Sequence, residues 1–121
     1  MTALEKVKAV VKALDEKKAS DIRVIEIRDI TVIADYFVIA GATSTTQVKA
    51  LSDEVDYQLG LLGEQPSHSE GYQSANWVVL DYGDVVIHVF HKETRAFYSL
   101  EKLWSDGKDV DVKALLSNVL S

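Results

Sequence analysis

The chain has 121 residues, of which 47% are hydrophobic, and this is enough for one compact domain with a buried core. Its 13 basic and 19 acidic residues give a formal charge of -6, so we expect no direct DNA binding, because affinity for phosphate backbones requires clustered Lys and Arg. The absence of cysteine excludes disulfides, thiolate catalysis and cysteine-based zinc sites, and without an apolar run of about 18 residues or a secretory signal we expect a cytoplasmic protein with no membrane segment.

The N-terminal part of the chain contains one helix pattern and two strand patterns. Apolar residues recur at helical spacing among lysines and acids over residues 3 to 18, which predicts an amphipathic helix. Residues 22–27 predict a strand, residues 29–34 a connection, and residues 36–40 a second apolar strand that ends at Gly41.

A second helix is predicted after residue 44. Ser44 and Gln47 have the spacing of a capping box, in which the serine hydroxyl and the glutamine side chain bind free amides at a helix start. Gly63 and Pro66 predict the end of this helix. The residues expected on its buried face are Val48, Leu51, Val55, Leu59 and Leu62.

A hairpin follows this helix. Residues 77–80 and 85–87 are nearly unbroken apolar runs, which predicts strands covered on both faces in the middle of a sheet. Residues 81–84 are expected to form the tight turn between them. Residues 67–74, which precede the hairpin, predict a loop or a short edge strand.

The C-terminal part of the chain returns to helical patterns. We expect residues 1–104 to form the main domain, with helical character over residues 92–104, and residues 105–121 to form a tail. In the tail, residues 105–109 predict a turn or linker. A short amphipathic helix is then predicted from Val112, Leu115, Leu116 and Val119. This order of elements predicts an α/β fold, with a mixed β-sheet flanked by helices.

Two groups of residues suggest an enzyme as the alternative function. Residues 41–44 connect a strand to a helix start, where free amides can hold a phosphate, but no phosphate-loop motif is present and capping by Ser44 explains the same residues. Asp81, Asp84 and Glu70 are of the types that bind a divalent metal or act as acid and base. Aspartates beside a tight turn also bind nearby amides, so we expect no catalytic residue, metal or cofactor here.

The histidines and serines give no local support for catalysis. His88 lies within an apolar strand pattern, which is typical of a hydrogen-bonded core or sheet-surface residue. His68 and His91 do not complete the i, i+4 pair of a zinc protease. No serine lies in a Gly-x-Ser-x-Gly context, which excludes the usual local signature of a serine hydrolase.

Aromatic and charged residues gather in and beside the hairpin. Tryptophan, tyrosine and arginine are the favoured anchors of protein interfaces, and here they stand among carboxylates, which favours a basic protein partner. Trp77 and His88 are also consistent with a core position. The candidate partner-binding residues are Glu70, Trp77, Asp81, Tyr82, Asp84, His88, Arg95 and Tyr98.

Two blocks of residues carry a resemblance to a known family. The first is Asp35-Tyr36-Phe37-Val38-Ile39-Ala40 followed by Gly41, Thr43-Ser44, Gln47-Val48 and Asp53. The second is Glu70-Gly71, the run Trp77-Val78-Val79-Leu80-Asp81-Tyr82-Gly83-Asp84-Val85-Val86-Ile87-His88-Val89-Phe90, and then Glu93, Arg95, Phe97-Tyr98, Leu100-Glu101 and Leu103-Trp104. In order and spacing these blocks resemble the ribosomal silencing factor family, also called RsfS or Iojap-like proteins. The resemblance covers residues 3–104, and this long pattern is more specific than a single short motif.

The resemblance implies a nucleotidyltransferase-like α/β fold and a non-enzymatic translational repressor. Members of the family are expected to bind the large ribosomal subunit through its basic protein L-fourteen, to block joining of the small subunit in starvation or stationary phase, and often to form homodimers. Nucleotidyltransferase relatives carry a Gly-Ser pair and an Asp-x-Asp pair. Here the Asp-x-Asp at residues 109–111 lies in the tail, outside the matched blocks. No Asp-x-Asp follows Gly41 within the matched blocks, and this departure argues against catalysis; a nucleotidyltransferase-like or phosphate-binding enzyme is the alternative function.

Overall fold

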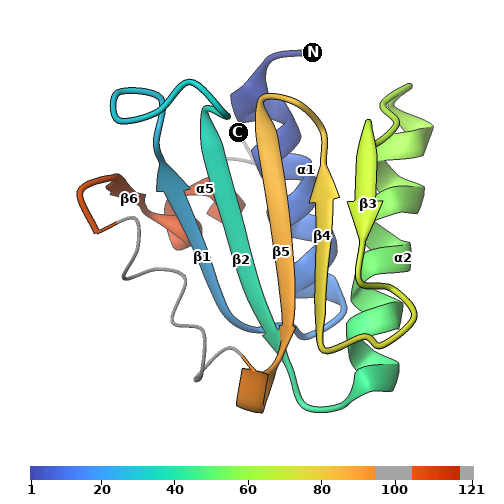
Figure 1. Ribbon diagram of the computed structural model, residues 1–121. Helices are drawn as coiled ribbons and strands as arrows, with labels where there is room; N and C mark the ends of the chain where they lie inside the picture. Colours follow the sequence, from blue (N-terminus) through green and yellow to red (C-terminus); the bar gives the residue numbers. More distant parts are fainter. Residues whose placement is uncertain (95–104, 118–121) are drawn as a thin grey trace.

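A six-stranded mixed β-sheet organises the described part of the chain (Figure 1). The structure, a computed structural model, describes residues 1–94 and 105–117. The strand order in the sheet is β3-β4-β5-β2-β1-β6. In chain order the elements are α1 (Ala3–Glu16), β1 (Ser20–Glu26), β2 (Tyr36–Ala42), α2 (Thr45–Leu61), β3 (His68–Glu70), β4 (Trp77–Asp81), β5 (Val85–His91), β6 (Lys108–Val110) and α5 (Val112–Ser117). The predicted α/β class with a mixed sheet is confirmed.

Strands β2 and β5 lie at the centre of the sheet and pair in parallel. Tyr36 is opposite Val85 and Ala42 is opposite His91, whereas the other neighbouring strands pair antiparallel. Parallel neighbours cannot be joined by a tight turn, and the chain between them supplies α2, β3 and β4 as the connection. Every residue of β2 is buried, as expected for a central strand with both faces covered.

Strand β4 departs from the prediction of a strand covered on both faces. Val78 and Leu80 are buried, but Trp77, Val79 and Asp81 on the opposite face are half-buried. Within residues 1–94 and 105–117, the three-residue strand β3 is the one strand beyond β4 at this side of the sheet, so β4 lies near an edge and one of its faces receives less cover. The prediction is correct for most of β5 and wrong for β4.

Helices α1, α2 and α5 lie on the same face of the sheet (Figure 1). Their apolar stripes pack against the strand residues that point to this face, and together they form the larger hydrophobic cluster. In α1 and α2 the buried apolar residues are Val7, Val10, Val11, Ala13, Leu14, Val48, Leu51, Val55 and Leu59. A second cluster on the opposite face consists, among the described residues, of strand and loop side chains, namely Ile25, Ile27, Ala34, Phe37, Ile39 and Phe90, with Trp77 and Val86 packed against them.

The ends of α2 follow from local sequence. The Ser44 hydroxyl accepts a hydrogen bond from the Gln47 amide at 3.0 Å, as predicted, but the Gln47 side chain binds Thr43 rather than completing the box at Ser44. At the other end Gly63 adopts a φ of 83°, and the amides of Gly63 and Glu64 close the last turn on Gly60 and Leu59. The helix ends at Leu61. Leu62, which was predicted to lie on its buried face, is exposed, so the prediction is wrong at this residue.

Part of the predicted tail belongs to the sheet. Residues 108–110 form β6, which pairs antiparallel with β1, so the prediction of a linker over residues 105–109 is wrong at its last two residues. The Arg23 guanidinium also binds the Asp109 carboxylate at 2.7 Å. The predicted helix is present as α5, and its Leu115 is buried in the larger cluster.

Other predictions have simpler outcomes. Strand β3 confirms the short edge strand, and residues 92–94, the described start of the helix predicted over 92–104, are helical. Residues 95–104 and Val119 lie outside the described residues. Within the described part of the chain, none of the helices has the length and apolar character needed to cross a bilayer.

We expect Gly71→Ala to destabilise the fold far more than Gly83→Ala. Both glycines have positive φ, at 85° and 87°, so both substitutions carry the same backbone strain of about 1 kcal/mol. A Cβ at Gly71 would lie 1.9 Å from the Trp77 carbonyl oxygen, whereas at Gly83 it would meet no atom within 4 Å. Chemical unfolding should therefore show an additional loss of about 2 kcal/mol or more for Gly71→Ala. Equal losses would contradict this account of the β3–β4 connection.

Candidate functional site

The sheet face opposite α1, α2 and α5 brings together most of the described candidate residues. We call it the aromatic face, after its side chains Phe37, Trp77, His88 and Phe90. Because directly paired residues share a face, strand register places side chains in rows across it. One row runs Trp77, Phe90, Gly41 and Ser20; the next runs Glu70, Val79, His88, Ile39 and Arg23; the third runs His68, Asp81, Val86, Phe37, Ile25 and Asp109.

Four rings form a continuous cluster on the aromatic face. The Trp77 and Phe90 rings stack with centroids 5.1 Å apart, and the Phe37 and His88 centroids are 4.7 Å apart. Trp77 also donates a hydrogen bond from Nε1 to His88 Nδ1 at 3.1 Å. The hydrogen bond and the stacking hold the indole in one orientation. Trp77 is half-buried, so part of the indole stays accessible.

His88 is neutral and its protonation pattern is determined by Trp77. The indole N–H can only donate, so Nδ1 must be the acceptor and the ring proton lies on Nε2. Burial lowers the pKa of His88 to about 4, because the charged ring would lose its hydration. Nε2 is buried and has no hydrogen-bond partner within the described residues. His88 therefore positions Trp77, as a buried sheet-surface residue, and is not an exposed base.

Carboxylates gather where the aromatic face meets the β3 edge of the sheet. Glu70 and Asp81 both point to this face, and we call this pair the acidic edge. Glu70 Oε1 lies 2.7 Å from His68 Nε2, and both side chains are mostly exposed. Asp81 accepts a hydrogen bond from the Gly83 amide at 2.8 Å, so it also stabilises the turn. The acidic edge thus offers negative charge beside the half-buried Trp77.

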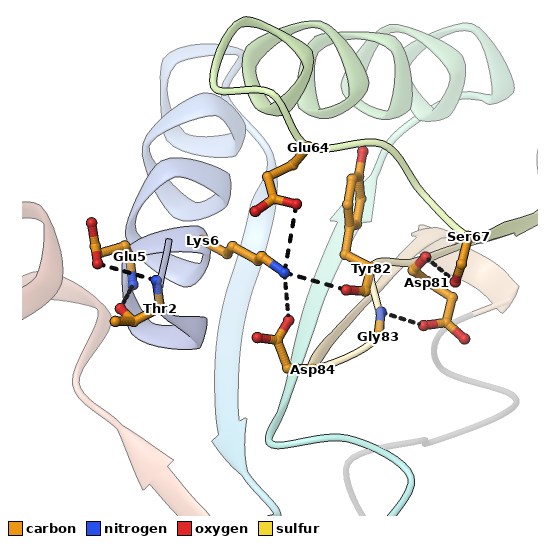
Figure 2. Close-up of polar contacts among 9 residues, drawn as sticks. All are labelled: Thr2, Glu5, Lys6, Glu64, Ser67, Asp81, Tyr82, Gly83 and Asp84. Atoms are coloured by element: carbon orange, nitrogen blue, oxygen red, sulfur yellow. Dashed lines mark hydrogen bonds and ion pairs between the residues drawn. The ribbon is translucent and has the colours of Figure 1, made fainter.

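Tyr82 and Asp84 point away from the aromatic face (Figure 2). Asp84 accepts a hydrogen bond from the Lys6 ammonium at 2.8 Å, and the same ammonium lies 3.8 Å from Glu64 and 3.4 Å from the Tyr82 carbonyl oxygen. The Lys6 side chain is nearly buried, so these oxygens replace its hydration. Tyr82, a candidate partner-binding residue, is 6% exposed and packs in the larger cluster, so little of its ring is accessible to a partner.

The structure therefore separates the sequence candidates into two groups. Glu70, Trp77, Asp81 and His88 share the aromatic face, whereas Tyr82 and Asp84 hold the β4–β5 turn against α1. Arg95 and Tyr98 lie outside the described residues. Sequence reasoning missed Lys6, the cation of the Asp84 pair. The available signal was its position one helical turn before Val10, at the edge of the apolar stripe of α1.

Side chains bind two of the amides at the helix start after β2. The Gln47 carbonyl oxygen accepts hydrogen bonds from the amide and hydroxyl of Thr43, and Ser44 caps the Gln47 amide. These contacts occupy donors that a phosphate would need. Within residues 1–94 and 105–117 there is also no group of three or more His, Asp or Glu side chains arranged to hold a metal ion.

Comparison with known proteins relates the chain to a family. The family profile described as "Ribosomal silencing factor during starvation" matches residues 1–119. The curated relative "Ribosomal silencing factor RsfS" of Halalkalibacterium halodurans is 40% identical over 97% of this chain and 100% of its own length. The protein of the same name from Bacillus subtilis is 44% identical over 83% of this chain and 85% of its own. "Mitochondrial assembly of ribosomal large subunit protein 1" of Mus musculus is 36% identical over 78% of this chain and 43% of its own length.

The fold is also similar to solved structures. A crystal structure of a Chromobacterium violaceum protein superposes with a TM-score of 0.85 at 35% identity and covers 87% of this chain and 88% of that one. A crystal structure of a Bacillus halodurans protein gives a TM-score of 0.79 at 39% identity, over 88% of this chain and 97% of the other. The family resemblance of residues 3–104 is confirmed, and the profile match extends it into the tail.

His88 should make stability depend on pH. Its folded-state pKa of about 4 lies below the ordinary value of 6.5, so the unfolded chain binds more protons between these values and stability falls as pH drops through this window. Between pH 7 and pH 5 the wild type should lose about 2 kcal/mol more unfolding free energy than His88→Phe, which has no imidazole to protonate. Identical losses in urea titrations of the two proteins would show that His88 is not the group responsible.

The strand-to-helix turn at Ser44 should be a cap and not a nucleotide site. Ser44→Ala removes the acceptor for the Gln47 amide and should cost about 1 kcal/mol of stability. Thr46→Ala, an exposed neighbour without a capping bond, is the control and should change stability little. Calorimetry with ATP should give no binding for the wild type or either variant. Saturable ATP binding that Ser44→Ala abolishes would overturn this interpretation and favour an enzyme.

Proposed function

Because the chain belongs to the ribosomal silencing factor family, we propose that it is a non-enzymatic repressor of translation that binds the large ribosomal subunit and prevents the small subunit from joining. The finer part of the proposal is that its contact is ribosomal protein L-fourteen, a basic protein on the intersubunit face, and that it acts in the cytoplasm in starvation or stationary phase. The names of the relatives, which include silencing factors and a large-subunit assembly protein, support this proposal.

The aromatic face with its acidic edge is the single observation that carries the proposal. A half-buried Trp77, held by His88 and Phe90, has the character of an interface anchor, since its apolar area is preorganised before binding. Glu70 and Asp81 beside it place negative charge where a basic protein would dock. The formal charge of -6 would steer such a partner toward the chain.

The proposed mechanism is occupancy. A protein that covers part of the intersubunit face excludes the small subunit by its volume, and its effect follows mass action between two competing partners. No bond is made or broken, so no catalytic residue or cofactor is required. The side-chain partners of the Thr43 and Gln47 amides at the start of α2 support this proposal, because they leave fewer free donors there for a phosphate.

The structure changes which residues we propose as contacts. Glu70, Trp77 and Asp81 are proposed as contacts, which is supported by their shared position on the aromatic face, and His88 is proposed to act by positioning Trp77. Arg95 and Tyr98 stay in the proposal from sequence alone. Tyr82 and Asp84 are proposed to hold the turn, because replacing Asp84 by lysine would place a second ammonium group against Lys6. Homodimer formation, which the family resemblance implies, is a separate proposal that sedimentation of the free protein can test.

Glu70→Lys should weaken binding to isolated large subunits by about tenfold, equivalent to roughly 1.4 kcal/mol. Glu70 is exposed, and among the described residues its side chain pairs with His68 alone, so the substitution should leave the fold intact. Asp15→Lys is the matched control, because it makes the same charge change at an exposed position of α1, on the other side of the sheet. Binding is measured by co-sedimentation with large subunits, and inhibition by the yield of joined ribosomes.

Three results would count against the proposal. Normal subunit joining at saturating wild-type protein would remove the silencing function. Equal weakening by Glu70→Lys and Asp15→Lys would mean that net charge alone, and not the acidic edge, governs binding. A salt dependence as steep as that of a protein tracking phosphates would indicate direct RNA contact, because pairs at an interface rim are screened only moderately.

A further inference from the structure

The loop that joins β1 to β2, residues 27–35, lies at one end of the sheet (Figure 1) and exposes a group of apolar side chains. Val32 is fully exposed, Ile33 is 59% exposed and Ile30 is 42% exposed. We call these three side chains the apolar tip. Isoleucine and valine are among the residues most often buried, and a group of them exposed on one loop is typical of a contact with another molecule.

Hydrogen bonds hold this loop in one shape. The Ile27 amide donates to the Asp35 carbonyl oxygen at 2.8 Å and closes the loop at its base. The amides of Ile30 and Thr31 both donate to the Ile27 carbonyl oxygen at 3.1 Å. The Ile33 amide donates to the Thr31 hydroxyl oxygen at 3.3 Å. A loop closed at its base and bonded internally is compact, so a partner would meet the apolar tip without having to order the chain that carries it.

The base of the loop belongs to the aromatic face. Ile27 and Ala34 are buried in the smaller hydrophobic cluster together with Phe37. Phe37 lies two strands from Asp81 in the same row of the sheet, a distance of about 10 Å. A stable protein interface covers about 800 Å² on each partner, which corresponds to a disc roughly 32 Å across. A partner of this size that covers Trp77 and the acidic edge therefore also reaches the loop.

The charges beside the apolar tip restrict the kind of partner that fits it. Asp29 and Asp35 flank the tip in the chain; Asp29 forms an exposed pair with Lys108 at 3.7 Å, and Arg28 is paired with Glu26 at 3.1 Å. Carboxylates repel the phosphates of RNA and of anionic lipid, and the tip carries no aromatic ring on which a base could stack. Two copies joined tip to tip would bring like charges together. A protein surface that is apolar at its centre and basic around it fits best.

We propose that the apolar tip is a second contact of the same interface, and that it binds an apolar patch on the basic protein that docks at the acidic edge. This inference rests on the proposed function, which supplies the partner. The two contacts act differently, because burial of apolar area contributes affinity that salt does not screen, whereas the acidic edge contributes encounter and orientation.

Val32→Ser tests this contact by co-sedimentation with isolated large subunits. The side chain is fully exposed in the free protein, so stability in chemical unfolding should be unchanged. Subunit binding should weaken about tenfold, as expected for the loss of one buried valine, and by the same factor at low and at high salt. Leu61→Ser is the matched control, because Leu61 is exposed at the end of α2 on the helix side, and it should change binding by less than twofold.

A crosslinking experiment identifies what the apolar tip touches. The chain has no cysteine, so Val32→Cys provides one position for a benzophenone label, and Leu61→Cys provides the control position. With large subunits present, the label at position 32 should crosslink to a protein of the subunit, and the label at position 61 should not.

The results separate this proposal from the function on which it rests. Wild-type protein that does not bind large subunits would remove the proposed function and this contact together. Wild-type binding with unchanged binding of Val32→Ser, or with equal weakening by Val32→Ser and Leu61→Ser, would remove the contact alone. A crosslink from position 32 to ribosomal RNA or to a second copy of the chain would also overturn the proposal.

Discussion

The parallel pairing of β2 with β5 is the constraint on which the rest of the structure depends. Parallel strands must be connected by a crossover, so the chain leaves β2, forms α2 over one face, and returns through β3 and β4 before it enters β5. The same path places the short strands β3 and β4 at one side of the sheet. The incomplete cover of β4 leaves Trp77 and Asp81 half-buried, and this produces the candidate interface.

The Lys6 junction links this sheet to its helices at one end. One ammonium group contacts Asp84 in the β4–β5 turn, Glu64 after α2, and the Tyr82 carbonyl oxygen (Figure 2). A nearly buried ammonium without these oxygens would cost several kcal/mol of desolvation. The contacts of Lys6 therefore hold α1, the residue after α2 and the β4–β5 turn together. The junction also explains why Asp84, one of the predicted contact residues, points toward α1.

The acidic edge places negative charge beside an aromatic anchor. The exposed Glu70 and the half-buried Asp81 lie on the same sheet face as Trp77, an arrangement that aids encounter with a basic protein and its orientation. This depends on alternation along β3, which directs Glu70 to the aromatic face and Ser69 to the helix side.

Sequence alone determined the features that neighbouring residues encode. The stripe of α1, the cap at Ser44, the stop at Gly63 and the alternation that puts Trp77 with Asp81 all depend on spacings of a few residues, and the structure has them. Tertiary structure decided what depends on distant pairing: β6 beside β1, the burial of Tyr82, and the contact of Lys6 with Asp84 across 78 positions. Periodicity indicates that a residue is buried, but only the register and the crossover decide what it is buried against.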